Sequence, residues 1–449
     1  MRNRPTSSVT RSRPSRAPER CSTVLPEVCV TTQSKRRFRG AKHQYWTARK
    51  RPFPMQRLKR VLVNGYWMLL WAQDILLRWR PLKAPTGKSA LIVHLGALGD
   101  FLLWVKQGCA LADRWRSEGY RVTLVANSAW GDLAAALPEF DEVIRLDRRR
   151  FERNLRYRWR TMRRIRACHA SKALNAQLSR ELAWGESVMA TCGAESRIGQ
   201  TGDLANISLW QRRFADSWYT QMVESSSDED EISRNAHFAK HLGVAIDTRS
   251  QGFPEWLNSP ISKRLPDQFF IVAPGAGWSG RRWPLDRFAS IVQQVFNAKN
   301  WVPVICGSTS ERYLSEELMR LAGNAHVIDL TGQTSLVDLC SVVARAKLVL
   351  ANESGIVHLA ALLQVPAVSI VGGGHFGRFL PYVKSNDLTP PEPVFHRMRC
   401  FGCNWRCIYP VPRDAAVPCI ERIAVELVRE KVSDILHEPT AHTHAGTRN

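Results

Sequence analysis

The sequence predicts an α/β fold made of two doubly wound, Rossmann-like domains. Short continuous apolar runs alternate with helical patterns in two separate stretches, the first beginning at Ser89 and the second after Pro266. Such runs are typical of parallel strands buried on both faces, and their alternation with helices indicates a doubly wound sheet. The chain has 449 residues, which is enough for two such domains and additional segments.

The basic charge is concentrated at the N-terminus. Residues 1–60 contain 17 Lys and Arg residues against two acidic residues, so they carry +15 of the formal net charge of +24. A uniformly basic nucleic-acid binder would look different, and we expect no nucleic-acid partner. Residues 1–54 are rich in Arg, Ser, Thr and Pro and are predicted to be a disordered basic extension. They are either a polybasic arm for anionic lipid or nucleic acid, or translated sequence upstream of a start at Met55.

Residues 55–83 are predicted to form an amphipathic helix. Between Leu58 and Leu82 lies an apolar stretch of about 17 residues that includes Trp and Tyr, is interrupted by polar residues and has basic flanks. A helix that spans a bilayer needs roughly 20 mostly apolar residues. The pattern favours a helix lying in the membrane interface, with a helix packed on the first domain and a spanning helix as alternatives.

The first domain is predicted over residues 84–255. Its elements are a strand over 90–95, a helix over 101–117, a strand over 121–126, a helix over 132–137 and a strand over 142–146. The basic helical segment 148–166 is either a solvated face or a surface for an acidic, phosphorylated glycolipid or the inner leaflet. The acidic stretch 224–233 is predicted to be a polar loop.

The second domain is predicted over residues 256–437, followed by a disordered tail over 438–449. Its strands are expected over 269–273, 301–306, 327–330, 348–351 and 367–371, and its helices over 285–297, 311–322, 336–344 and 355–363. Ligands of doubly wound sheets bind beyond the carboxyl ends of the strands. We therefore look for a site in the loops that follow Leu95, Ala273, Cys306, Leu330 and Ala351.

Glycine distinguishes two of these loops. In the first, Gly96 and Gly99 let the backbone approach a ligand closely, and Asp100 stands at the start of the helix, either as its N-cap or as a reactive group. In the second, Gly275 and further glycines precede Arg281 and Arg282. Backbone N–H groups and a guanidinium fork can bind a phosphate there. The alternative is a solvated turn in which Trp283 anchors the next helix.

The loop after Ala351 leads directly into an apolar helix. Ser354 can cap that helix, and the N–H groups of Gly355, Ile356 and Val357 would point at an anion with the helix dipole behind them. His358 lies one turn further, where it either faces the same site or is a structural histidine.

Four of the eleven cysteines are clustered, namely Cys400, Cys403, Cys407 and Cys419. Four thiolates can ligate a structural zinc ion, and an iron–sulfur centre or unliganded thiols are the alternatives. The other seven cysteines are scattered and are expected to be small buried hydrophobic residues.

From Ser89 to Glu430 the sequence resembles glycosyltransferase family 9, which includes the ADP-heptose:lipopolysaccharide heptosyltransferases. The resemblance rests on LGALGD at 95–100, PG at 274–275 with RRWP at 281–284, DLTGQTSL at 329–336 and NESGIVHLAA at 352–361. It implies a GT-B architecture: an N-terminal acceptor domain, a C-terminal nucleotide-sugar domain and a cleft between them. It also implies an inverting transfer that requires neither a metal nor another cofactor.

The resemblance also implies roles for individual residues. Asp100 would be the general base that takes the proton of the acceptor hydroxyl. Arg281 stands where the family usually has Lys, and Glu353 where Asp is common. The long N-terminal extension is a further departure. The expected donor-binding residues are Gly275, Arg281, Arg282, Glu353, Ser354, Gly355, Ile356, Val357 and His358, with Glu311 for the donor ribose.

We therefore expect a transferase that moves a sugar, on the resemblance a heptose, from an ADP-heptose-like donor to an acidic glycolipid or lipopolysaccharide acceptor. The expected location is cytoplasmic, peripherally associated with the inner membrane. Two alternatives remain open. One is a relative that uses another sugar donor in O-antigen or capsule assembly, and the other is a non-catalytic, membrane-associated nucleotide- or glycan-binding protein.

Overall fold

A computed structural model describes residues 66, 69–79, 87–225, 230–244, 253, 256–257, 259–323, 326–382 and 388–437. All of them belong to the compact unit Arg60–Asn449. The expectations for residues 1–54 and 438–449, and for Cys21 and Cys29, lie outside the described residues.

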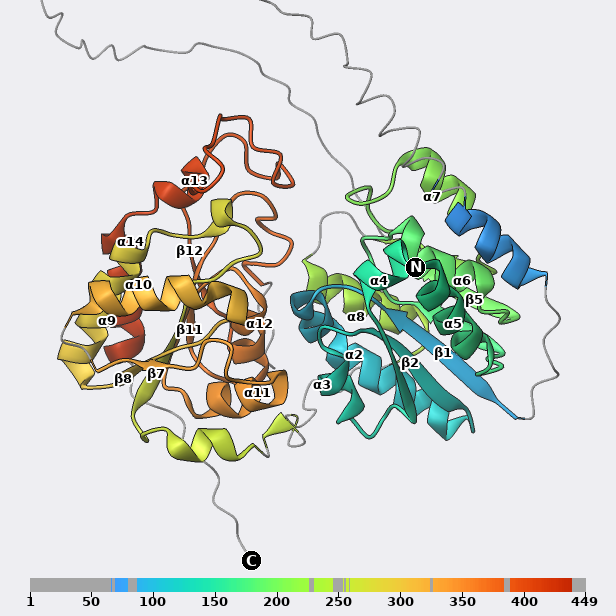
Figure 1. Cartoon of the computed structure of the whole chain (residues 1–449), viewed down its shortest axis with the longest axis horizontal. Coiled ribbons are helices and arrows are strands. Elements are labelled where there is room, and N and C mark those ends of the chain that lie inside the picture. The colour runs from blue at the N-terminus through green and yellow to red at the C-terminus, as the bar shows by residue number, and fades with distance from the viewer. Residues whose placement is uncertain are drawn as a thin grey trace, which may run out of the picture. The chain divides into compact units, whose positions relative to one another are not determined.

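The first sheet has six parallel strands in the order β3-β2-β1-β4-β5-β6 (Figure 1). Residues 90–93 of its central strand are fully buried, as their continuous apolar run predicts. The strands are β1 (Ser89–His94), β2 (Arg121–Asn127), β3 (Glu142–Leu146), β4 (Lys172–Asn175), β5 (Ser196–Gln200) and β6 (Gln221–Val223). The helices are α2 (Leu98–Ser117), α3 (Gly131–Ala135), α4 (Arg148–Arg153), α5 (Leu155–Arg166), the π-helix η1 (Leu182–Glu186), α6 (Ser187–Thr191), α7 (Leu209–Asp216) and α8 (Glu231–His241).

The second sheet also has six parallel strands, in the order β12-β11-β10-β7-β8-β9. If β7 is numbered as the first strand and the order is read from the β9 edge, the second sheet has the same strand order as the first sheet. The strands are β7 (Phe269–Ala273), β8 (Val302–Ile305), β9 (Ile328–Asp329), β10 (Val349–Asn352), β11 (Ala367–Ile370) and β12 (Glu392–Val394). The helices are η3 (Pro260–Arg264), η4 (Ser279–Arg281), α9 (Leu285–Lys299), η5 (Thr309–Glu311), α10 (Arg312–Ala322), α11 (Leu336–Arg345), α12 (Gly355–Leu362), α13 (Pro418–Glu421) and α14 (Val425–His437).

The two sheets share one apolar cluster. It contains Phe101 of α2, Trp130 beside α3, Trp256 between the sheets in sequence, and Val357 of α12, all fully buried. The rings of Phe101 and Trp130 are stacked with centroids 4.1 Å apart. Because apolar burial is the main favourable term in folding, this cluster fixes α2 and α12 in contact.

Three local predictions are wrong. Helix α2 begins at Leu98 rather than Phe101, because the Asp100 carboxylate bonds the N–H of Ala97 and so closes a first helical turn. The basic segment 148–166 is two helices, since Asn154 has extended backbone and caps the second. Residues 231–233 open helix α8, whose N-cap is Asp230, and so do not belong to a loop.

Residues 69–78 form a helix, as predicted for that part of 55–83. Its inner face is packed on the first sheet's helices: Asp74 accepts a hydrogen bond of 3.0 Å from Nε of the buried Arg158, and Gln73 donates to the Leu155 carbonyl. Within the described part of the chain, no helix is long and apolar enough to cross a membrane. The contacts with Arg158 and Leu155 confirm that this helix packs on the first domain, its outer face is exposed, and its position in a membrane interface stays a prediction.

Candidate functional site

The site lies where the strand order of each sheet reverses. These points are between β1 and β4 in the first sheet and between β7 and β10 in the second. In open parallel sheets ligands bind beyond the carboxyl ends of the strands at such a point. The loops after β1, β7 and β10 are three of those that the glycine and charge patterns single out. The loop after β4, with Glu181, was missed.

Asp100 occupies the third position of helix α2, three residues after the N-cap Ala97. Its Oδ2 accepts the Ala97 N–H at 2.7 Å, while Oδ1 makes no hydrogen bond to another described residue. A Cβ atom on Gly96 would lie 2.9 Å from Asp100 Oδ2, so only glycine leaves the carboxylate this space. Asn127 and Trp130 fix the loop by donating to the Gly96 carbonyl at 2.9 Å each. The N-cap alternative is wrong, because Asp100 sits inside the first turn.

Burial raises the pKa of Asp100, which suits a base that must hold a proton transiently. The Ala97 N–H, the Arg378 and Arg148 guanidinium groups and His375 act in the opposite direction. These groups offset part of the effect of burial, and the net shift of the Asp100 pKa is upward.

Glu181 is a second carboxylate in the neighbourhood of Asp100. Its pKa is raised to about 7, chiefly by burial, with Asp100 and Glu152 adding to the rise and Arg148 opposing it. Its Oε1 accepts a hydrogen bond of 2.8 Å from Asn206. Arg148 lies 4.0 Å from the centroid of the Trp184 ring, so this side of the site offers a charge and an aromatic face.

The loop of Asp100 faces the start of α12 directly. A Cβ on Gly99 would lie 3.1 Å from His358 Cδ2, and a Cβ on Gly355 would lie 3.0 Å from Leu98 Cδ2. Both positions therefore need a residue without a side chain if the two helices are to approach this closely. The contact places the Asp100 turn of the first sheet beside the α12 start of the second.

The start of α12 has free donors. Ser354 is the N-cap, as predicted, but its hydroxyl makes no capping bond, and the Val357 N–H bonds the Ser354 carbonyl at 3.1 Å. Two expectations are therefore wrong. Ser354 does not cap the helix through its side chain, and the Val357 N–H is not free. The N–H groups of Gly355 and Ile356 have no partner within the helix, which is the usual setting of an anion site.

Glu353, which is buried, and Arg281, which is half-buried, form a pair next to that helix start. Arg281 Nη2 donates to the Glu353 carbonyl at 2.7 Å and lies 3.5 Å from the Glu353 carboxylate. Burial raises the pKa of Glu353, and Arg281 partly offsets this. Glu353 Oε2 and Arg281 Nε are buried without a hydrogen-bond partner. Buried polar atoms without partners suit a site that a polar ligand completes.

Of the other residues expected to bind the nucleotide-sugar donor, Gly275 and Glu311 lie together and Arg282 lies apart from them. A Cβ on Gly275 would lie 1.9 Å from Glu311 Oε1, so Gly275 makes room for the Glu311 carboxylate after β8. Glu311 is held by the Ser308 N–H at 2.8 Å. Arg282 instead donates to the Tyr313 hydroxyl on α10. The structure thus brings Gly275 and Glu311 together, whereas Arg282 is engaged elsewhere.

Asn352 connects the two loops of the second sheet. Its side chain donates to the Pro274 carbonyl at 2.7 Å and accepts the Trp283 N–H at 3.0 Å. Trp283 is itself buried and donates to the Ile423 carbonyl. The loops that carry Arg281 and Glu353 are therefore held in one geometry, and Trp283 anchors helix α9 as the alternative reading expected.

His358 is buried, and its Nδ1 is 2.6 Å from the Tyr382 hydroxyl. Burial lowers its pKa to about 3, so the imidazole is neutral. Its ring lies between α12 and Gly99, which favours a structural histidine at the contact between the two helices.

The four clustered cysteines line one small cavity together with Met398, Trp405 and Tyr409. Burial, and then the charges of the other three thiols, raise the pKa of Cys419. Within the described residues no three His, Cys, Asp or Glu side chains are arranged as a ligand set for a metal ion. The convergence on one cavity fits a metal site in residue type, and the metal stays a prediction.

Comparisons with known proteins agree with this arrangement. A model of the family described as glycosyltransferase family 9 (heptosyltransferase) matches residues 158–389. A lipooligosaccharide heptosyltransferase 2 of Campylobacter jejuni is 27% identical over 161 residues, which are 35% of this chain and 48% of that protein. The chain spans less than half the length of the first curated relatives that it matches.

Solved structures resemble the whole two-sheet unit. The glycosyltransferase family 9 structure from Veillonella parvula has a TM-score of 0.59 at 18% identity and covers 78% of this chain and 98% of its own. The Escherichia coli heptosyltransferase WaaC with ADP-2-deoxy-2-fluoro heptose has a TM-score of 0.55 at 16% identity and covers 77% and 99%. At this identity the likeness concerns the fold alone.

Two Rossmann-like sheets, with their reversal points facing each other at Asp100 and at the start of α12, define a protein of the GT-B fold class, and the predicted fold is confirmed. Within that class, the chain belongs to glycosyltransferase family 9.

Proposed function

We propose that this protein is an inverting glycosyltransferase that moves a heptose from a nucleoside-diphosphate donor to a hydroxyl of a lipopolysaccharide-type glycolipid. The observation that carries the proposal is the contact of the Asp100 turn with the start of α12, through Gly99 and His358. It sets a carboxylate with a free oxygen beside an anion-binding helix start, which is the pair of groups that this transfer needs.

In the proposed step, Asp100 accepts the proton of the acceptor hydroxyl while the hydroxyl oxygen attacks the anomeric carbon of the donor. The new C–O bond forms as the bond to the diphosphate oxygen breaks, and the configuration at that carbon inverts. The diphosphate leaves with the electron pair. The N–H groups of Gly355 and Ile356, with Arg281, stabilise the charge that develops on it, so the chemistry needs no metal.

The identity of the donor is supported by the chemistry of the second sheet's loops and by the family. Free N–H groups and Arg281 suit a diphosphate, and the Glu311 carboxylate suits ribose hydroxyls. A solved relative holds an ADP-heptose analogue, which favours this donor class over other nucleotide sugars. A different sugar donor remains the second candidate, because no described residue distinguishes one sugar from another.

Thermal unfolding of the full chain with ADP, ADP-heptose, and UDP- and GDP-sugars tests the donor. A ligand that binds only the folded state raises the melting temperature, by an amount set by its concentration relative to Kd. We expect the largest rise with ADP-heptose. If nucleotides raise the melting temperature but the protein transfers no sugar, the non-catalytic alternative is correct. If no nucleoside diphosphate changes the melting temperature, the proposal is contradicted.

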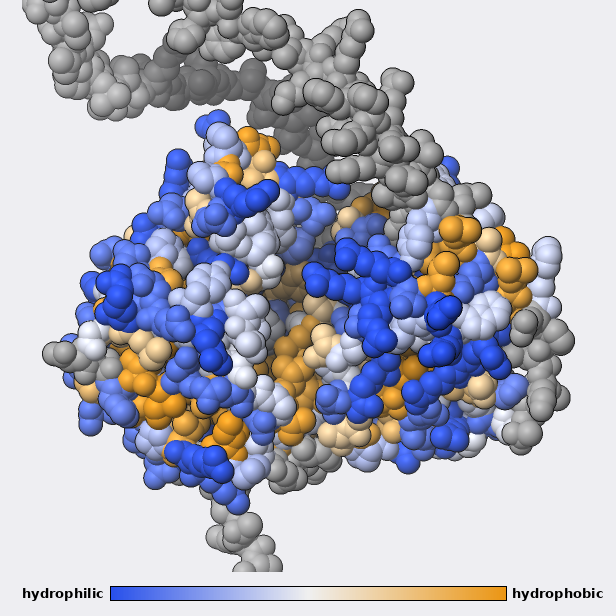
Figure 2. All heavy atoms as spheres, in the orientation of Figure 1, coloured by the Kyte–Doolittle hydropathy of each residue, from blue (hydrophilic) through white to orange (hydrophobic). Residues whose placement is uncertain are grey.

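We further propose that the protein works on the inner-leaflet surface through an exposed apolar platform, made of Leu69, Trp71, Leu76, Trp79, Leu209, Trp210 and Phe214. Trp79 and Trp210 are 78% and 68% exposed, and the rings of Trp71 and Phe214 join helix 69–78 to α7 with centroids 5.9 Å apart. In Figure 2 hydrophobic residues appear where helix 69–78 lies in Figure 1, beside hydrophilic residues of α5.

Charge around the platform supports an anionic surface as its partner. Helix α5 packs against helix 69–78 through Arg158 and turns Arg156, Arg160 and Arg163 to solvent. Aromatic and aliphatic side chains beside arginines are the usual composition of a surface that rests in the headgroup region of anionic lipid. The same arginines suit a phosphorylated acceptor.

We also propose that the cysteine cluster holds a structural zinc ion. Cys400, Cys403, Cys407 and Cys419 would supply four thiolates, and the ion would fix the 400–419 loop. The metal content of the purified full chain tests this. About one zinc ion per chain is expected, lost in Cys403→Ser and kept in Cys168→Ser, a half-buried cysteine elsewhere. An equal and negligible content in all three proteins would exclude the site.

A further inference from the structure

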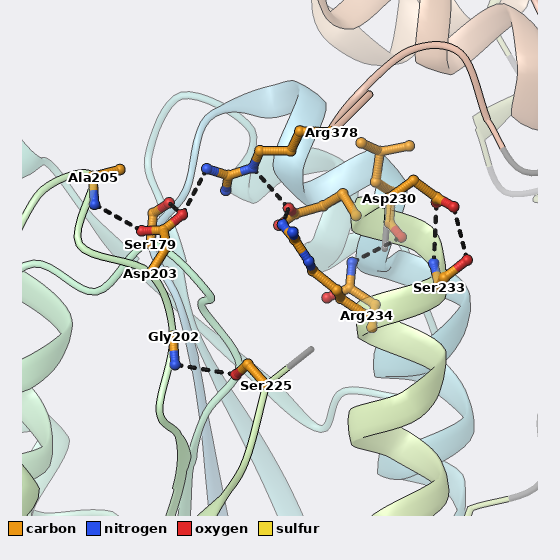
Figure 3. Close-up of polar contacts among 12 residues, drawn as sticks. Ser179, Gly202, Asp203, Ala205, Ser225, Asp230, Ser233, Arg234 and Arg378 are labelled. Atoms are coloured by element: carbon orange, nitrogen blue, oxygen red, sulfur yellow. Dashed lines mark hydrogen bonds and ion pairs between the residues drawn. The ribbon is translucent and has the colours of Figure 1, made fainter. Parts of the chain in front are cut away.

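Residues 371–382, which follow strand β11 of the second sheet, reach the first sheet through Arg378. Its Nη1 lies 2.8 Å from Asp203 Oδ2 (Figure 3). Its Nε lies 2.9 Å from Glu231 Oε2. The Arg378 carbonyl also accepts the Glu231 N–H at 2.8 Å. One residue thus makes three polar contacts to two different segments of the first half.

Both carboxylates have neighbours within the first half, and Glu231 Oε2 lies 4.0 Å from Arg234 Nη1. Asp203 accepts bonds from the Ser179 hydroxyl at 2.8 Å and from the Ala205 N–H at 3.0 Å, as Figure 3 shows. Glu231 lies in the first turn of α8 and is 7% exposed. Arg378 therefore binds a preformed pair of acceptors, so little ordering is needed when it docks.

Helix α8 connects this ion pair to the helix of Asp100. Asn235 of α8 donates to the Leu103 carbonyl of α2 at 3.1 Å. Three residues before Arg378, the segment is braced by the cysteine loop, because Trp405 Nε1 donates to His375 Nδ1 at 3.2 Å. The segment is thus held at His375 and at Arg378, and α8 links Arg378 to α2.

The charges of the segment reach Asp100. Burial raises the pKa of Asp100, and the charges of Arg378, Arg148 of α4 and His375 oppose that rise. In return, Asp100 raises the pKa of the carboxyls on the two other elements that face it, the loop after β4 and α8. The titratable and charged groups around Asp100 are thus Arg148, Glu181, Glu231, His375 and Arg378.

We propose that Arg378 is a positioning residue that clamps the 371–382 segment of the second half onto Asp203 and Glu231 of the first, and so keeps Asp100 opposite the start of α12. This inference rests on the proposed function in one respect, namely that Asp100 is the general base. Arginine suits this place, because its rigid planar group presents Nε and Nη1 in fixed directions to the two carboxylates, whereas the lysine ammonium is a compact point charge without such a fork.

The experiment compares Arg378→Gln, Arg378→Lys and Asp203→Asn with the wild-type full chain. Arg320→Gln is the matched control, because it removes an exposed Arg–Glu pair of α10 within the second half. Three quantities are measured: kcat and KM over pH, nucleotide affinity by calorimetry, and amide hydrogen exchange at the start of α8. Asp203→Asn removes one arm while leaving the buried Glu231 paired, which keeps the test usable if Arg378→Gln folds poorly.

We expect Arg378→Gln to lower kcat by about tenfold with an unchanged nucleotide Kd, because the donor loops are intact. The acidic limb of kcat/KM should move up by about one pH unit, because a cation that favours the ionised Asp100 is lost. Arg378→Lys should keep the limb in place and lose part of kcat. Exchange of the Glu231 amide should quicken in Arg378→Gln and stay unchanged in Arg320→Gln.

The proposal is overturned if Arg378→Gln keeps the wild-type kcat and acidic limb. It is also overturned if kcat falls only in proportion to the folded fraction while the limb stays in place, since that would be a purely structural role. If the wild-type protein transfers no sugar, the proposed function fails. In that case unchanged exchange of the Glu231 amide in Arg378→Gln would overturn the clamp separately.

Discussion

At the scale of single residues, Asp100 is the group on which transfer should depend most. Asp100→Asn keeps an oxygen for the Ala97 N–H but cannot take a proton, so we expect transfer to fall by about 10²- to 10⁴-fold with little change in melting temperature. Initial rates with saturating donor measure this. The control is Asp132→Asn, also in the first turn of a helix but exposed. Undiminished transfer would remove Asp100 from the mechanism.

Glu181 should make stability depend on pH. Its pKa in the folded protein is about 7, above the ordinary value of 4.5. The contribution of Glu181 to the free energy of unfolding is therefore fully present below pH 4.5, and it is lost as the pH rises through 7. Glu181→Gln should therefore be more stable than wild type at pH 8.5, by about 2 kcal/mol, and equal to it near pH 4.5. Denaturant unfolding at both pH values measures the difference. A difference that does not change with pH would show that Glu181 titrates normally.

At the scale of helices and strands, the α2–α12 contact should tolerate no added methyl group. A Cβ at Gly355 meets Leu98, so Gly355→Ala should shift α12 and lower kcat by about tenfold to hundredfold. Stability should fall by about 1–3 kcal/mol because the contact is overpacked, a loss that the helix preference of alanine offsets only in part. Adding Leu98→Ala should restore part of the rate by making room. Gly87→Ala, where nothing lies within 4 Å of the new Cβ, is the control.

What the sequence predicts at this scale depends on how local the signal is. The strand at 269–273 is a run of five apolar residues and is predicted to the residue. Strand β4 reads KALN and β6 only QMV, so neither has an apolar run that could be recognised, and Glu181 was missed with them. Arg378 was missed because its partners lie 147 and 175 residues away in the chain. Local spacing carries no trace of such a contact.

At the scale of the whole molecule, binding to membranes should depend on both the platform and salt. We expect the full chain to sediment with vesicles that contain anionic lipid. Binding should weaken as the salt concentration rises from 0.05 to 0.5 M, because the Debye length falls from about 14 to about 4 Å. Bromine-labelled lipids should quench tryptophan fluorescence if Trp79 and Trp210 enter the headgroup region.

Leu76→Glu combined with Trp79→Glu should reduce vesicle binding at least about tenfold, since two exposed apolar side chains that would enter the lipid are replaced by carboxylates, which anionic lipid repels. Leu427→Glu, which alters a comparably exposed leucine on α14, should not. Equal binding by both variants would show that the platform does not touch lipid. A change in oligomeric mass instead would identify the platform as an interface between copies of the chain.

The two sheets have the same strand order, and each brings its own set of loops to the site. The segments that would recognise the donor come from β7, β8 and β10, whereas those that would meet the acceptor come from β1 and β4. Substitutions in one half can therefore change its ligand without changing the ligand of the other half, provided that Gly99, Gly355 and Arg378 maintain the contact between the halves. A chimaera that exchanges the first half with that of a relative should then inherit the acceptor of one parent and the sugar of the other.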